Sequence, residues 1–149
     1  MKRVLVILAV LAGFALAAGA EAATTVEHDT FDATFPLCNG DLIHVSGPLL
    51  VASTTTSTPS GGFIVAVHFQ PQGITGVDLS DGTVFHATGL TRDLIVFSPA
   101  GGVTETFVNQ FHIQATGGAE SYIVTELFHI TVSPDGTVRT LFDNFSATC

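Results

Sequence analysis

The sequence predicts an all-β protein, an antiparallel meander of about eight or nine strands that closes into a barrel or, alternatively, folds over as a β-sandwich. Two observations support this fold class. Beyond residue 22, short runs rich in Val, Ile, Thr and Phe follow one another without any amphipathic helical stretch. Turn residues such as Asn39-Gly40, Asp81-Gly82 and Gly117-Gly118 interrupt these runs at regular intervals. No change of composition marks a domain boundary, so we expect residues 23–149 to form a single domain.

Strand-like segments can be followed in order along the chain. Those predicted are 26–36, 42–55, 63–70, 74–79, 83–88, 91–98, 103–115, 121–132 and 137–147. Each contains β-branched or aromatic residues and is bounded by Gly, Pro, Asn or Asp, which favour turns. The Ser/Thr-rich tract from Thr54 to Ser60 predicts a long hairpin tip rather than a linker.

The N-terminus predicts a secretory signal peptide over residues 1–22. Met1-Lys2-Arg3 is followed by an unbroken apolar run, and Ala20-Glu21-Ala22 is the small-residue motif that precedes cleavage. The apolar run is about 15 residues long, which is shorter than a membrane span. We therefore expect an exported protein, extracellular or periplasmic, whose folded part comprises residues 23–149.

The chain that remains after signal cleavage is acidic. It keeps two basic residues, Arg92 and Arg139, against twelve acidic ones, which gives a net charge of −10. Binding to nucleic acids or anionic lipids needs clustered Lys and Arg. We therefore expect neither nucleic acid nor a membrane as a partner. The acidic charge can alternatively serve solubility alone.

Two cysteines, Cys38 and Cys149, predict one disulfide bond. An exported protein with an even number of cysteines usually pairs them, and two cysteines allow only one pairing. Cys38 follows the first predicted strand and Cys149 follows the last. In a simple meander these two positions meet at the same pole only if the number of strands is odd, which agrees with nine.

The C-terminal half allows residues to be paired across strands. Centring a hairpin on Gly117-Gly118 pairs Phe107 with Phe128 and Asn109 with Glu126. Centring the next hairpin on Pro134-Asp135-Gly136 pairs Phe128 with Phe142 and Glu126 with Asn144. One face of these strands then points inward. The core residues predicted on it are Phe107, Phe111, Phe128, Phe142, Ile113, Val124 and Ile130.

A polar row lies within this predicted apolar face. Asn109, Glu126 and Asn144 fall side by side on three adjacent strands. A buried carboxylate needs hydrogen-bond partners, which two flanking amides can supply, and burial raises its pKa as a general acid or base requires. Glu126 is therefore a candidate catalytic residue, oriented by Asn109 and Asn144. Alternatively, the row is a structural network that fixes strand register, or it lies in water at an open barrel mouth.

Other residues on the predicted inward face are candidates for ligand binding. They are Phe107, Phe128, Phe142, Tyr122 and Glu105. A one-residue bulge after Pro134-Asp135-Gly136 would remove Asn144 from the polar row.

The six histidines do not predict a metal site. His129 lies opposite Thr106 in the predicted register, six residues along the strand from His112, and no His-x-His or Cys-x-x-Cys motif is present. The registers of His44, His68 and His86 are undetermined by the sequence. Since no phosphate-binding or dinucleotide motif is present either, we expect no cofactor.

Three segments carry a resemblance. Phe35-Pro36-Leu37-Cys38-Asn39-Gly40, Glu105-Thr106-Phe107-Val108-Asn109 and the C-terminal 143–149 resemble those of small exported bacterial β-proteins of unassigned function. The predicted architecture is similar to allene oxide cyclase-like and dirigent-like barrels, a likeness at the level of the fold. Neither resemblance implies any site residue.

Three functions fit these observations. The first is a secreted barrel that binds a small apolar ligand or a surface partner, which the Phe-rich inward face favours. The second is a cyclase or isomerase with Glu126 as acid and base. The third is an exported structural or adhesion domain without a pocket.

Overall fold

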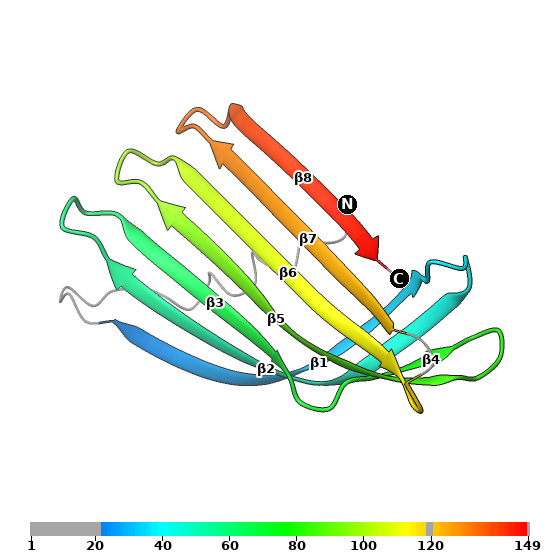
Figure 1. Cartoon of the computed structure of the whole chain (residues 1–149). Helices are drawn as coiled ribbons and strands as arrows, with labels where there is room; N and C mark the ends of the chain where they lie inside the picture. The colour runs from blue at the N-terminus through cyan, green and yellow to red at the C-terminus, as the bar shows by residue number, and fades with distance from the viewer. Residues whose placement is uncertain (1–21, 119–120, 149) are drawn as a thin grey trace.

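The fold is a single antiparallel β-sheet in this computed structural model, which describes residues 22–118 and 121–148 (Figure 1). The strands are β1 (Ala23–Pro36), β2 (Leu42–Ser57), β3 (Phe63–Pro71), β4 (Thr75–Asp78), β5 (Val84–Phe97), β6 (Val103–Ala115), β7 (Ser121–Val132) and β8 (Val138–Thr148). The predicted all-β class is confirmed. Residues 1–21 of the predicted signal peptide lie outside the described residues. Within the described part, no helix is long and apolar enough to cross a membrane.

The structure has eight strands rather than nine because two predicted segments are halves of one strand. Segments 83–88 and 91–98 both belong to β5, in which Gly89 continues the strand and pairs with Phe111. The strand order is β1-β2-β3-β5-β6-β7-β8, and the short β4 pairs with β2 and β5. Since β3 and β4 both lie antiparallel between β2 and β5, they are two parts of one interrupted strand.

The path across the sheet therefore has seven positions, an odd number. Strands β1 and β8 run in the same direction and end at the same pole of the sheet. Figure 1 shows the end of β8 close to the turn that follows β1. Cys38, in that turn, lines a small depression together with Ala147 near the end of β8. The predicted partner, Cys149, lies outside the described residues, so the disulfide stays a prediction.

Three hairpins at the opposite pole use the same turn. Their sequences are Thr58-Pro59-Ser60-Gly61-Gly62, Ser98-Pro99-Ala100-Gly101-Gly102 and Ser133-Pro134-Asp135-Gly136-Thr137. In each, the first residue's N–H donates to the fifth residue's carbonyl, and the glycine at the fourth position donates back to the first residue's carbonyl. The three glycines have φ between +81° and +93°, a conformation that glycine adopts without steric cost. Proline supplies the fixed φ that begins such a turn.

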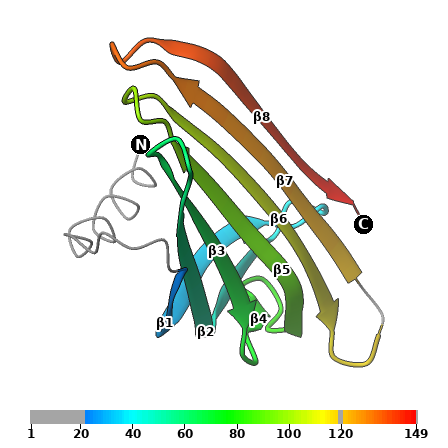
Figure 2. The same ribbon diagram turned by 90° about the vertical axis from the view of Figure 1, so that its left-hand side faces the viewer.

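The sheet bends where β2 changes partner. Ile43–Ser46 pair with β4, and Leu49–Ser57 pair with β3. Gly47, between the two stretches, has a φ of +152°, and a Cβ atom there would lie 2.8 Å from Cα of Ile74. This close approach requires glycine. The bend turns the sheet into a trough, tightly curved at one pole and fanned open at the pole of the three hairpin turns (Figure 2).

The hydrophobic core fills the tightly curved pole. Its largest fully buried side chains are Phe85, Ile43, Ile74, Ile113 and Val45. Phe111 and Val124 pack against this cluster. The predicted core is thus confirmed for Ile113, whereas Phe107, Phe128 and Ile130 are only half-buried. Phe142 was predicted wrongly, because 47% of its surface is exposed.

The trough has two edge strands. Among the described residues, β1 pairs only with β2, and β8 pairs only with β7. Closure into a barrel is therefore not established by the strand pairing, and the choice between barrel and sandwich stays open.

Candidate functional site

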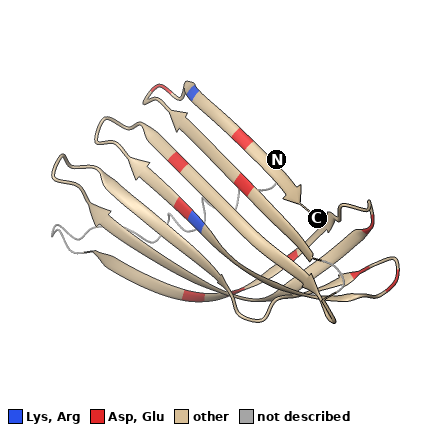
Figure 3. Ribbon diagram, viewed as in Figure 1, with Lys and Arg blue, Asp and Glu red and all other residues tan. Residues whose placement is uncertain are grey.

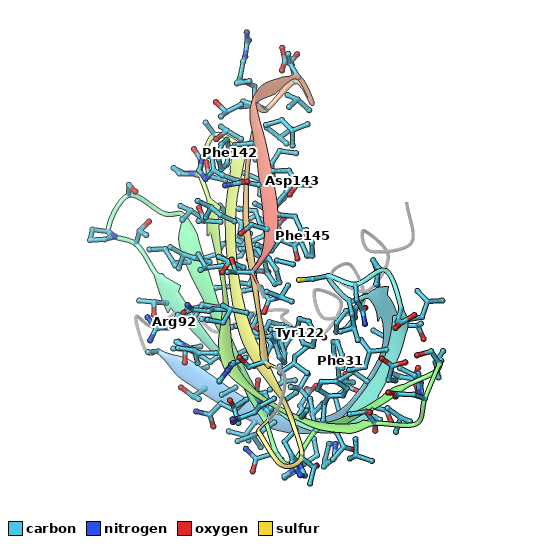
Figure 4. All side chains as sticks on the ribbon, turned by 45° about the vertical axis from the view of Figure 1, so that its right-hand side comes forward. Phe31, Arg92, Tyr122, Phe142, Asp143 and Phe145 are labelled. Atoms are coloured by element: carbon cyan, nitrogen blue, oxygen red, sulfur yellow. The ribbon has the colours of Figure 1, made fainter. Side chains whose placement is uncertain are left out.

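The strand pairing divides the sheet into an inner and an outer face. We call inner the face that carries the buried side chains of Ile43, Phe85 and Ile113, because these line the hollow of the trough. Cross-strand partners point to the same face. Arg92 lies on the outer face, and Figure 4 shows it on the far side of the ribbon from Phe31 and Tyr122.

A polar row crosses the inner face on three neighbouring strands. Thr91 of β5 lies opposite Asn109 of β6, and Asn109 lies opposite Glu126 of β7. The predicted pairing of Asn109 with Glu126 is therefore confirmed. The Thr91 Oγ1 hydroxyl donates a 2.8 Å hydrogen bond to Asn109 Oδ1. Thr91 is buried, while Asn109 and Glu126 are half-buried.

Asn144 does not belong to this row, contrary to the prediction. It pairs with Leu127, and Phe145 takes the place opposite Glu126. The cause is a bulge: Val132 pairs with Val138 as predicted, but Thr131 pairs with Thr140. Arg139 is the extra residue, and every later side chain of β8 changes face.

The bulge also moves Phe142 to the outer face, so its predicted place opposite Phe128 is wrong. Phe142 lies opposite His129, and Asp143 lies opposite Phe128. Figure 4 shows Asp143 and Phe145 on the hollow side of β8 and Phe142 on the other side. Phe107 and Phe128 remain inner-face partners, as predicted.

Tyr122 and Glu105, the other two predicted ligand-binding residues, lie in different parts of the inner face. Tyr122 is buried in the core, where its ring lies 5.8 Å from that of Phe85. It belongs to the curved pole rather than to the open part of the trough. Glu105 is half-buried in the open part, between Ile95 on β5 and Ile130 on β7.

Asp93 is the inner-face acid that the sequence analysis missed. It is 7% exposed, and its Oδ1 atom is buried without a hydrogen-bond partner. It lies opposite Phe107 and next to Thr91 along the inner face of β5. Burial, together with the smaller effect of the nearby charge of Glu105, raises the pKa of Asp93 to about 6. Burial likewise raises the pKa of Glu105.

The open part of the trough therefore combines carboxyl groups with aromatic side chains. Figure 3 shows acidic residues on β5, β6, β7 and β8 of this sheet, and basic residues on β5 and β8. Among the described residues those basic residues are Arg92, on the outer face, and Arg139, in the bulge of β8. The inner face between β5 and β7 thus presents acids and no arginine or lysine.

The described histidines do not gather at one place. His44, His68 and His86 lie on the outer face, opposite Val77, Arg92 and Thr75 respectively. His44 Nε2 lies 3.3 Å from Asp32 Oδ1, and His129 Nδ1 lies 2.8 Å from Thr106 Oγ1. In the described part of the chain, no three His, Cys, Asp or Glu residues form a group that could hold a metal ion.

Glu126 lines neither of two depressions on the described surface. The larger, about 400 Å³, lies on the outer face around Gly89, between Leu90, Gln110 and Ile123. The smaller is the one that Cys38 and Ala147 line. The candidate site lies on the concave inner face of the trough (Figure 2).

Comparison of the chain with protein-family models, with curated proteins and with solved structures found no match.

Proposed function

We propose that this is an exported binding protein that holds a small apolar ligand in the open part of its trough. The observation that carries the proposal is Asp93, buried among apolar side chains with an unpartnered Oδ1 atom. A buried polar atom without a partner costs free energy. A ligand that donates a hydrogen bond to this carboxyl group would remove that cost.

The chemistry of the inner face supports a ligand with an apolar body and a donor or cationic end. Phe107 and Phe128 pair across β6 and β7 and offer half-buried aromatic surface. Asp93 and Glu105 lie beside them, and each has a raised pKa. Carboxyl groups accept hydrogen bonds and attract cations, whereas they repel anions. An aliphatic amine fits this face better than a fatty acid of the same length.

Binding of N-phenyl-1-naphthylamine, an apolar fluorophore, tests the apolar part of the proposal. Two phenylalanines provide a matched pair of variants, because Phe128 lies on the inner face and Phe142 on the outer face of neighbouring strands. We expect Phe128→Ala to weaken binding of the fluorophore about tenfold, and Phe142→Ala to leave it unchanged. Equal effects of the two substitutions would contradict binding in the trough.

Displacement of the fluorophore tests the polar part. Dodecylamine and dodecanoic acid have the same chain length and opposite charges at neutral pH. We expect dodecylamine to displace the fluorophore at a lower concentration than dodecanoic acid does. The double variant Asp93→Asn/Glu105→Gln should reduce this difference between the two compounds. Tighter binding of dodecanoic acid would show that the carboxyl groups do not select the ligand.

A second candidate, an acid–base enzyme of the cyclase or isomerase kind, is favoured by the Asp93–Glu105 pair. A carboxyl group with a pKa of about 6 is suited to exchange protons near neutral pH. Glu126, the acid predicted from the sequence, lies on the same face. Mass spectrometry of material that co-purifies from the native host discriminates the two functions. Recovery of one unchanged compound with the wild type and Glu126→Gln, and of less of it with Asp93→Asn, supports binding, whereas conversion by the wild type alone supports an enzyme.

A further inference from the structure

Strand β8 is the most exposed strand of the sheet. All residues from Val138 to Thr148 are exposed, including Leu141 and Phe145 on the inner face and Phe142 on the outer face, at 65%, 59% and 47%. Within the described residues, no strand pairs with β8 on the side away from β7. An edge with unpaired backbone groups and apolar side chains on both faces is a template for another strand.

The two edges of the sheet differ in charge. Strand β1 has three exposed acids, Glu27, Asp29 and Asp32, no Lys or Arg, and a proline at its end. Charges of one sign and proline are features that protect an edge strand from pairing. Strand β8 instead carries one acid, Asp143, and one base, Arg139, so it is neutral in a chain of net charge −9.

We propose that β8 pairs antiparallel with β8 of a second copy of this chain, centred on Leu141, and that the protein is thereby a two-fold symmetric dimer. In this register Leu141 faces its counterpart, and Arg139 of each chain, at the bulge, comes next to Asp143 of the other, within reach of its long side chain. Opposite charges that face each other across strands are favourable. Because the pair occurs at both ends of the interface, the charge pattern is self-complementary, as a two-fold axis requires.

Other registers lose this complementarity. Centring the pairing on Phe142 places Arg139 opposite Phe145, and centring it on Asp143 places the two Asp143 carboxylates opposite each other. Like charges directly opposite one another are unfavourable. The direction also fits, because pairing of two β8 strands about a two-fold axis is antiparallel, as all pairs of this sheet are. Closure of β8 onto β1 within one chain would be parallel, since both strands run the same way.

Sedimentation velocity of the mature, oxidised chain with charge-reversed variants tests the proposal. We expect the wild type to sediment as a dimer at about 100 µM, and Asp143→Arg and Arg139→Asp each to raise the dissociation constant about tenfold or more. An equimolar mixture of the two variants should recover the dimer, because the two arginines of one chain then face the two aspartates of the other. The chain carrying both substitutions should also dimerise. The same reversal on the other edge, Glu27→Arg, should leave dimerisation unchanged.

Several results would overturn the proposal. They are a monomeric wild type at about 100 µM, failure of the mixed variants to associate, loss of the dimer in Glu27→Arg, and assembly beyond the dimer.

Arg139 Nε also donates a 2.8 Å hydrogen bond to Ser133 Oγ, so Arg139→Asp can perturb the turn. Hydrogen exchange of the unmodified protein therefore provides an independent measurement. Backbone amides of β8 should exchange more slowly at high than at low protein concentration. The exchange rates of the β1 amides should not depend on protein concentration. Slower exchange at high concentration in β1 alone would equally refute pairing through β8.

Discussion

Thr91 and Asn109 are joined by a side-chain hydrogen bond across β5 and β6, inside the hollow of the trough. The distance from Thr91 Oγ1 to Asn109 Oδ1 is 2.8 Å, and Thr91 is 6% exposed. Asn109 is in turn the cross-strand partner of Glu126 on β7. The hydrogen bond from Thr91 therefore orients the middle member of the polar row.

Replacing Thr91 by valine tests how much this bond stabilises the fold. Thr91→Val keeps the shape of the side chain but leaves the half-buried Asn109 oxygen without this donor. We expect the free energy of unfolding to fall by about 1–2 kcal/mol, measured by urea denaturation followed by circular dichroism. Thr91→Ser retains the hydroxyl group and should cost less. A valine variant as stable as the wild type would show that the bond contributes no net stability.

The raised pKa of Asp93 predicts that stability depends on pH. The pKa is about 6 in the folded protein and about 3.8 for an unperturbed aspartate, so the folded state binds the proton more tightly than the unfolded state. The contribution of protonated Asp93 to the free energy of unfolding is therefore complete below about pH 4, and it is lost as the pH rises to about 6. We expect a loss on the order of 2 kcal/mol across this window.

Asp93→Asn should remove that dependence, because the amide does not titrate. Denaturation at a series of pH values and at low micromolar protein concentration, where association through β8 does not contribute, measures it. Asp143→Asn, at an exposed position on the same face, should keep the wild-type profile. If Asp143→Asn loses the pH dependence instead, then Asp143 and not Asp93 is the carboxyl group that causes it.

The first C-terminal hairpin could be predicted at the level of single residues because its turn is symmetric. Gly117 and Gly118 both have positive φ, and the strands alternate apolar and polar residues on either side. The same rule applied to the five-residue turn Ser98-Pro99-Ala100-Gly101-Gly102, which is centred on Ala100, pairs Asp93 with Phe107, as the structure does. The sequence therefore contains the signal that places Asp93 on the inner face.

The second hairpin shows where such reasoning fails. The turn residues Pro134-Asp135-Gly136 correctly predict that Val132 lies opposite Val138, but Arg139 then adds one residue to β8. A bulge costs little and has no sequence signature here, so Asn144 and Phe142 were assigned to the wrong face. Gly89 likewise suggests a break in β5 that the structure does not have. The bend at Gly47 depends on contact with Ile74, which is distant in sequence.

The predicted disulfide between Cys38 and Cys149 can be tested on the unfolded chain. The position of Cys38 beside Ala147 supports the pairing. We expect no thiol to react with Ellman's reagent in the oxidised, denatured mature protein, and two after reduction. Closing a loop of this length stabilises a protein by about 4–5 kcal/mol in the chain-entropy model, so reduction should lower the midpoint of urea denaturation. Two reactive thiols before reduction would exclude the bond.

The position of the core at the curved pole predicts a contrast between two phenylalanines. Phe85 is fully buried and packs against Tyr122, whereas Phe142 is 47% exposed on the outer face of the edge strand. We expect Phe85→Ala to lower the free energy of unfolding by about 3–5 kcal/mol and Phe142→Ala by less than about 1 kcal/mol. Urea denaturation at low micromolar protein concentration measures both, which keeps association through β8 out of the comparison. Because the two substitutions remove the same atoms, a loss as large for Phe142→Ala would mean that the bulge at Arg139 is absent and that Phe142 points into the trough.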